Sequence, residues 1–112
     1  QIAATHLGLD PVARMRHLKI ILDLSNHHNA TPFALLGDLN TLFPWEPARR
    51  HLEKAFIGQK QPASYPARRP FLACDGIYLR QAEALQSVRI FLEGAARSAS
   101  DHLPLIADIR LL

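Results

Sequence analysis

The alternation of apolar and polar positions along the chain predicts helices and strands in a mixed order. Residues 11–27 repeat apolar side chains every three to four positions, as an amphipathic helix packed on a sheet does. Asp10 and Glu46 are each followed by proline, which is a helix-start signal, and a second helix is therefore predicted over residues 48–57. The remaining apolar runs predict strands at residues 2–7, 33–36, 71–79, 85–92 and 103–112.

This order of elements, β-α-β-α-β-β-β, indicates the α/β class, with a mixed β-sheet and both helices on one of its faces. Residues 33–36 are apolar throughout and are expected to form a central strand buried on both faces. Prolines in residues 59–70 and small side chains in residues 94–102 predict loops. A length of 112 residues is that of a single small unit, residues 1–112, with one hydrophobic core.

Composition and charge exclude some classes of protein. No run approaches the roughly 18 consecutive apolar residues of a membrane-spanning helix, so a transmembrane protein is not expected. Cys74 is the single cysteine, which excludes an internal disulfide, and no Cys/His spacing indicates structural zinc. The net charge of +3 permits a polyanionic partner without requiring one. The chain starts at Gln1 and enters a strand at once, which favours a piece of a longer protein; a cytoplasmic location is only slightly favoured.

Polar side chains with catalytic chemistry stand at the ends of several apolar runs. They are His6, Asp38, Asn40, Asp75, Asp101 and His102. Because strand ends in α/β sheets meet around ligands, we expect these side chains to converge. Carboxylates and imidazoles together suit a divalent metal and a phosphoryl group held against an activated water. A carboxylate fixes the tautomer of an imidazole, and the other ring nitrogen can then take a proton from water.

These residues lie in motifs whose order and separations match a known family. The motifs are Thr5-His6-Leu7, Gly37-Asp38-Leu39-Asn40, Asp75-Gly76-Ile77-Tyr78 and Ser100-Asp101-His102-Leu103-Pro104. Over essentially all 112 residues the chain resembles the closing half of the endonuclease/exonuclease/phosphatase superfamily. The resemblance implies half of a four-layer α/β/β/α sandwich of the deoxyribonuclease I type. Residues 1–112 would then be the carboxy-terminal half of one such domain.

The resemblance also implies a role for each matched residue. His6 would contact the scissile phosphate as a catalytic and substrate-binding group. Asp38 would position or activate the nucleophilic water, and Asn40 would bind phosphate and help to orient the site. Asp75 would support His102, so that the two form an Asp–His pair. Phosphodiester or phosphomonoester hydrolysis by activated water is the activity implied for the parent protein, and the isolated chain is expected to be inactive.

The implied cofactor is Mg²⁺, with Mn²⁺ as an alternative, and Asp101 would be a metal ligand. The family's principal metal ligand is a Glu in an opening half that these 112 residues do not contain. Arg68 and Arg69 stand in the loop before Asp75 and are candidates to bind a polyanionic substrate, although solvated charge is the alternative interpretation. Nucleic acid, a phospholipid headgroup and an inositol phosphate all stay open as substrates.

A competing hypothesis is a non-catalytic α/β module that binds a phosphorylated ligand, nucleic acid or a protein partner through the same loops. A lone half-sandwich would also expose an apolar sheet face, so we expect self-association or pairing with the missing half.

Other side chains are expected to have structural roles. Cys74 is expected to pack in the interior, on the opposite face of its strand from the site. Phe43 and Trp45 are expected to pack in the core, with a stacking surface as the alternative. His27 and His28 are expected to be a solvated helix end and not a metal-binding pair.

Overall fold

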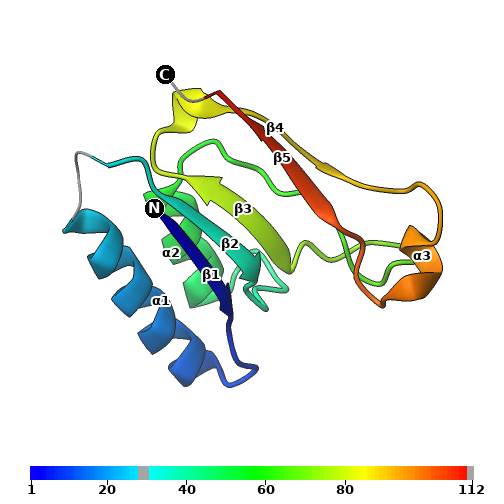
Figure 1. Cartoon of the computed structure of the whole chain (residues 1–112). Helices are drawn as coiled ribbons and strands as arrows, with labels where there is room; N and C mark the ends of the chain where they lie inside the picture. The colour runs from blue at the N-terminus through cyan, green and yellow to red at the C-terminus, as the bar shows by residue number, and fades with distance from the viewer. Residues whose placement is uncertain (28–30, 111–112) are drawn as a thin grey trace.

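The structure of the protein is a computed structural model that describes residues 1–27 and 31–110. It has the α/β class and the helix and strand order that the sequence predicts, with short additional turns (Figure 1). The elements are β1 (Ile2–His6), α1 (Pro11–Asn26), β2 (Ala34–Asp38), α2 (Pro47–Ala55), β3 (Asp75–Leu79), the 3-10 turn η1 (Ala82–Ala84), β4 (Leu85–Ile90), α3 (Ala96–Ala99) and β5 (Leu105–Ile109).

The strands are divided between two sheets. In the first sheet β2 lies in the centre, parallel to β1 and antiparallel to β3, so this sheet is mixed as predicted. Strands β4 and β5 form an antiparallel pair of their own, and β5 contacts β3. Figure 1 shows α1 and α2 on the same side of the three-stranded sheet, while β4, β5 and α3 extend away from it.

The hydrophobic core lies between the three-stranded sheet and the two long helices. Leu18 of α1, Leu35 of β2 and Leu52 of α2 are fully buried there, and each fully buried leucine contributes about 1.5–3 kcal/mol relative to an exposed one. The rest of this core cluster is Leu7, Phe33, Leu39, Ala48, Phe56 and Tyr78. One core therefore fixes β1, β2 and β3 against the helices.

The starts of the helices follow from the residues that precede them. Asp10 caps α1 by accepting a hydrogen bond from the backbone N–H of Val12, at 3.2 Å. Glu46 precedes α2 without such a cap, because its carboxylate pairs at 2.9 Å with the buried guanidinium of Arg14. Arg14 also donates to the carbonyl oxygen of Gly8, at 3.2 Å. This one side chain therefore joins α1, the segment after β1 and the start of α2.

The third strand is shorter than predicted. It begins at Asp75 and not at residue 71, because Leu72 forms an isolated bridge with Tyr65 and Phe71 points outward, 72% exposed. The predicted loop at residues 94–102 contains the short helix α3. The last strand ends at Ile109, and Leu111 and Leu112 lie outside the described residues, as does His28.

Two glutamine side chains occupy the outer edge of β3. The amide of Gln61 bonds both backbone groups of Ile77, accepting from its N–H at 3.0 Å and donating to its carbonyl at 2.9 Å. Gln59 does the same for Leu79, at 2.8 and 2.6 Å. The side-chain amides thus take the positions that a neighbouring strand would have, and they satisfy an edge that would otherwise be unpaired.

Within the described residues, no helix combines the length and the apolar character needed to cross a bilayer.

Candidate active site

Strand register brings three of the predicted residues together. His6 lies opposite Asp38, and Asp38 lies opposite Asp75, across the three strands of the sheet. Because side chains alternate along a strand, all three project from the face opposite the one that packs on the helices, where Leu35 and Tyr78 point. The site is therefore built at one end of the open face of the sheet.

His102 completes this group from the segment just before β5. Its Nδ1 lies 2.7 Å from Asp75 Oδ2, and its Nε2 lies 3.8 Å from Asp38 Oδ2. On the far side of Asp38, His6 Nε2 lies 3.6 Å from the same oxygen. The four side chains form a row, Asp75, His102, Asp38 and His6, in which carboxylates and imidazoles alternate.

Gly37 sets the close approach of the strands beside this row. Its φ of +139° is a conformation that side chains rarely adopt, and a Cβ there would lie 1.8 Å from the carbonyl oxygen of Thr5. Only glycine lets β1 and β2 come this near. Gly37 lies opposite Thr5, and the next pair along the two strands is His6 and Asp38. The backbone at this position therefore determines the spacing of the two side chains.

The Asp75–His102 pair is held from several sides. Ser64, which is fully buried, donates from Oγ to the same Asp75 oxygen that His102 contacts. The Ser64 carbonyl accepts from the backbone N–H of Leu103, at 2.8 Å, and the Tyr65 ring lies 4.9 Å from the His102 ring, centre to centre. These contacts orient His102 so that Nδ1–H donates to Asp75 and Nε2 faces Asp38.

The pKa of His102 follows from opposing effects. Burial lowers this pKa, but the hydrogen bond to Asp75 and the charges of Asp75, Asp38 and Asp101 together outweigh burial and raise it above the usual value. An imidazole of raised basicity with its second nitrogen aimed at a carboxylate is suited to accept a proton from a bound water.

Asn40 lies beside the site, where its backbone and side chain make hydrogen bonds that hold the ends of β1 and β2 together. It is a non-glycine residue with positive φ, 51°, and its backbone N–H donates to Asp38 Oδ1 at 3.1 Å, as in an Asx turn. Its buried side-chain amide donates to the carbonyl of Leu7, which ties the end of β1 to the end of β2. The phosphate contact predicted for Asn40 would therefore use the second N–H group of its side-chain amide, because the first already donates to Leu7.

The other predicted contacts lie outside the row of four side chains. Asp101 is exposed, and its backbone carbonyl accepts from Ala67 at 2.8 Å. Arg68 and Arg69 are both exposed, and the Arg68 carbonyl accepts from the guanidinium of Arg97 at 2.9 Å. The loop before β3 thus presents its positive charges to solvent, where substrate contact stays a prediction.

Cys74 is buried as predicted, but the prediction that its side chain points away from the site is wrong. Its Sγ lies 3.7 Å from Asp75 Oδ2 and 3.8 Å from His102 Nδ1, so it contacts the Asp–His pair. Strand alternation does not apply to Cys74, because β3 begins one residue later. Burial raises the pKa of the thiol to about 12, and the charges of Asp75 and Asp38 add to this effect.

The core packing expected for Phe43 and Trp45 is also wrong. The two rings are stacked on one another, 4.8 Å apart and 6° from parallel, and they are 41% and 68% exposed. They follow Asn40 by only a few residues. They lie in the turn that precedes α2, and Pro44 between them is the residue that could have indicated this turn.

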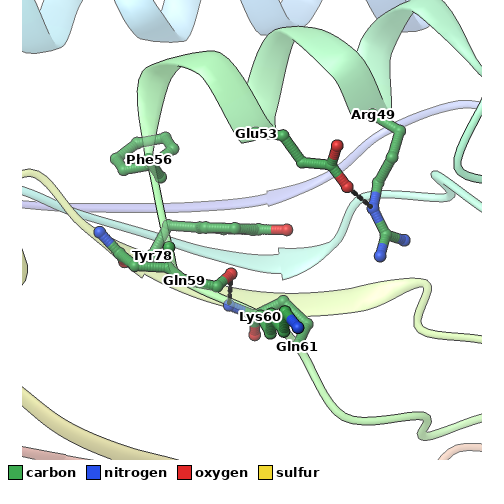
Figure 2. Close-up of a pocket in the computed structure, with 8 residues that line it drawn as sticks. Arg49, Glu53, Phe56, Gln59, Lys60, Gln61 and Tyr78 are labelled. Carbon is green, nitrogen blue, oxygen red and sulfur yellow. Dashed lines mark hydrogen bonds and ion pairs between the residues drawn. The ribbon is translucent and has the colours of Figure 1, made fainter.

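A cavity of about 450 Å³ lies on the helix side of the sheet. Figure 2 shows its lining, in which Arg49 pairs with Glu53. Gln59 also lines this cavity, and its side chain bonds to Leu79 of β3. The Arg49 guanidinium also donates to the carbonyls of Thr41 and Ala73. Because Tyr78 faces this cavity and Asp75 faces the opposite side, the cavity is separate from the row of carboxylates and imidazoles.

The donor atoms near the site do not form a magnesium site by themselves. Mg²⁺ prefers oxygen ligands in octahedral geometry. Among the described residues, the group of possible ligands that gathers within 4.8 Å is Cys74, Asp75 and His102, a sulfur, an oxygen and a nitrogen. Asp101 is outside this group. These residues alone therefore do not make up a magnesium site, and the Mg²⁺ that the sequence resemblance implies stays a prediction.

Comparison with known proteins defines the fold. No family model matches the sequence, and no curated protein matches it. A functionally unknown conserved protein from Enterococcus faecalis V583 matches the structure with a TM-score of 0.76 at 21% identity, over 97% of this chain and 49% of that one. An endonuclease/exonuclease/phosphatase family protein from Bacteroides thetaiotaomicron matches with a TM-score of 0.65 at 12% identity, over 93% and 47%.

These similarities identify the fold as mixed α/β of the deoxyribonuclease I-like type. The chain spans about half the length of the solved structures that it matches.

Proposed function

We propose that this chain supplies the acid–base half of a phosphoester hydrolase site. The row in which His102 stands between Asp75 and Asp38, at 2.7 and 3.8 Å, carries the proposal. The fold shared with an endonuclease/exonuclease/phosphatase family protein supports it. Phosphodiesters and phosphomonoesters both fit this chemistry.

The proposed reaction uses this chain's own groups to move a proton and orient the phosphoryl group. Water attacks phosphorus, a new P–O bond forms, and the ester P–O bond breaks. The proton of the water passes to the Asp38–His102 pair, whose facing atoms lie 3.8 Å apart, and returns to the departing oxygen. Asp75 keeps the imidazole oriented and stabilises its positive charge. His6, with its side chain 75% exposed, donates to a phosphoryl oxygen.

Metal dependence belongs to the proposal, but this chain does not contain the whole metal site. Mg²⁺ or Mn²⁺ would neutralise charge on the phosphoryl oxygens when bound. Asp101 is the carboxylate that this chain would offer, and we propose that the principal ligand, a Glu, comes from residues outside these 112. Acid–base chemistry and metal binding would then come from different halves of one domain.

We also propose that the open face of the sheet is covered by that second half or by a second copy. Apolar side chains of this face remain accessible, among them Ile2, which is 73% exposed. A cavity of about 310 Å³ beside it is lined almost entirely by apolar atoms, from Ile2, Phe33 and Leu79 to Ile109 of β5. Light scattering that shows a monomer at high concentration would contradict self-association and leave the second half as the partner.

The test is hydrolysis of a chromogenic phosphodiester by a protein extended upstream of Gln1, with Mg²⁺ and then with EDTA. We expect turnover that EDTA removes and that His102→Gln and Asp38→Ala each lower by roughly 10²–10⁴-fold, the usual contribution of positioned acid–base groups. His17→Gln, an exposed histidine on α1, is the matched control and should leave turnover unchanged.

Metal-dependent turnover that survives His102→Gln would refute the acid–base assignment. A folded, extended protein that binds a phosphate ester without hydrolysing it would favour the non-catalytic binding module instead.

A further inference from the structure

The thiol of Cys74 gives the site a donor set that its proposed chemistry does not use. Sγ, Asp75 Oδ2 and His102 Nδ1 lie together at the start of β3, with the sulfur 3.7 and 3.8 Å from the other two atoms. Thiolate, imidazole and carboxylate are the three ligand types that Zn²⁺ binds in proteins. Mg²⁺, by contrast, avoids sulfur ligands.

The spacing of these atoms is close to that of a tetrahedral zinc site. Zn–S bonds of about 2.3 Å and Zn–N or Zn–O bonds of about 2.0–2.2 Å place neighbouring donors roughly 3.3–3.7 Å apart. Both distances from Cys74 Sγ are already near this range. The remaining distance, from Asp75 Oδ2 to His102 Nδ1, is 2.7 Å because a hydrogen bond joins the two atoms, and it would widen when a cation replaces the proton.

We propose that Cys74, Asp75 and His102 form a capture site for Zn²⁺, and that zinc bound there blocks the Asp75–His102 pair. The binding part stands on the donor geometry alone. The blocking part rests on the function proposed above.

The protons balance through a change of tautomer. Zinc takes the place of the thiol proton, which is released to solvent, and it binds Nδ1 of a neutral imidazole whose proton now resides on Nε2. That Nε2–H faces Asp38 Oδ2, 3.8 Å away, and the carboxylate would accept it after the two side chains move closer together. A metal-bound histidine that donates its other ring N–H to a carboxylate is the usual arrangement around zinc. The same Nε2 can then no longer accept a proton from water.

The ion can reach these ligands from the open face of the sheet. The His102 side chain is 28% exposed, and its partners Asp75 and Asp38 line a cavity of about 240 Å³. Cys74 is 2% exposed and is the most deeply buried of the three ligands. Water or a ligand from the covering half would complete the coordination.

Binding is tested on the 112-residue chain with Co²⁺ as a spectroscopic substitute and with Zn²⁺ alone as competitor. We expect a thiolate-to-cobalt charge-transfer band in the near ultraviolet that Zn²⁺ abolishes. Cys74→Ser should remove the band and weaken Zn²⁺ binding by roughly tenfold or more, since a first ligand matters at least as much as its outer-shell partners. His17→Gln is the control for adventitious binding by surface histidines.

A second measurement keeps the proposal testable where the variants fold poorly. In the unaltered chain, Zn²⁺ should slow modification of Cys74 by a thiol reagent, whereas Mg²⁺ should not. A cobalt complex without the charge-transfer band, or thiol modification that Zn²⁺ leaves unchanged, would overturn the site.

The two proposals fail separately. Zinc bound through Cys74 in a protein without hydrolytic activity would leave the site intact and overturn the function. Hydrolysis that Zn²⁺ inhibits equally in the wild type and in Cys74→Ser would overturn the blocking role.

Discussion

Replacing Asp75 by asparagine separates the charge of the Asp–His pair from its hydrogen bonds. His102 Nδ1 and Ser64 Oγ both donate to the same carboxylate oxygen, Oδ2, so the single oxygen of an asparagine can accept from both. Asp75→Asn therefore keeps the geometry and removes the negative charge. Hydrogen bonds to charged groups contribute about 1.5–3 kcal/mol and neutral ones about 0.5–1.5 kcal/mol. Two such bonds predict a loss of about 2 kcal/mol when His102 is protonated.

The loss should depend on pH with a defined sign. The raised pKa of His102 means that the folded state binds its proton more tightly than the unfolded chain does. This stabilisation is complete below the unfolded value of about 6.5 and disappears as the pH rises through the folded pKa. Asp75→Asn should lower the pKa of His102, because the charge of Asp75 is removed and the retained hydrogen bond becomes a neutral one, while burial still opposes the charge.

Two measurements check this prediction. Histidine ring signals in an NMR titration, assigned with His102→Gln, report the pKa of His102 directly. Urea unfolding at pH 5.5 and pH 8.5 should give a larger loss at the lower pH. Asp108→Asn removes an exposed carboxylate on β5 and is the matched control. It should change neither the titration of His102 nor the pH dependence of unfolding. An unaltered titration of His102 in Asp75→Asn, or equal losses at the two pH values, would refute the proposed pairing.

Three further predictions concern stability and exposure. Gly37→Ala should lower the free energy of unfolding by at least about 3 kcal/mol, through backbone strain and overlap with the neighbouring strand. Gly94→Ala, with open space around it, should lower it by about 1–2 kcal/mol, and denaturant unfolding measures both losses. Leu35→Ala in the core should lose about 2–5 kcal/mol, and Leu24→Ala on the exposed face of α1 less than about 0.5 kcal/mol; similar losses would contradict the core assignment. Trp45, the single tryptophan, should fluoresce like an exposed indole and be readily quenched by acrylamide, and a shielded spectrum would contradict its placement.

Much of the fold could be predicted because its signals are local. Asp10 followed by proline marks the start of α1, and the apolar period of three to four residues marks its length. The approach of His6, Asp38 and Asp75 also followed from the sequence, because each stands at the end of an apolar run. Their proximity is observed, while their catalytic roles stay predictions.

The errors arose where the outcome depends on distant partners. Residues 71–79 have the composition of one strand, but Tyr65 takes Leu72 as its bridging partner and the ladder starts later. The alternation of side chains along a strand therefore predicts the wrong side for Cys74, because Cys74 precedes the first residue of β3. Trp45 has a side chain typical of cores, yet its loop holds it away from one. None of these pairings is visible in a local window of sequence.

The glutamine amides along β3 give the three-stranded sheet two unequal edges. Gln59 and Gln61 already bond the outward backbone groups of β3, whereas β1 pairs only with β2 among the described residues. The edge of this sheet that is open to pairing with another strand is therefore that of β1, among the described residues. The outward backbone groups of Ile77 and Leu79 are already satisfied within the chain, so replacing the two glutamines would open a second edge of this sheet to pairing.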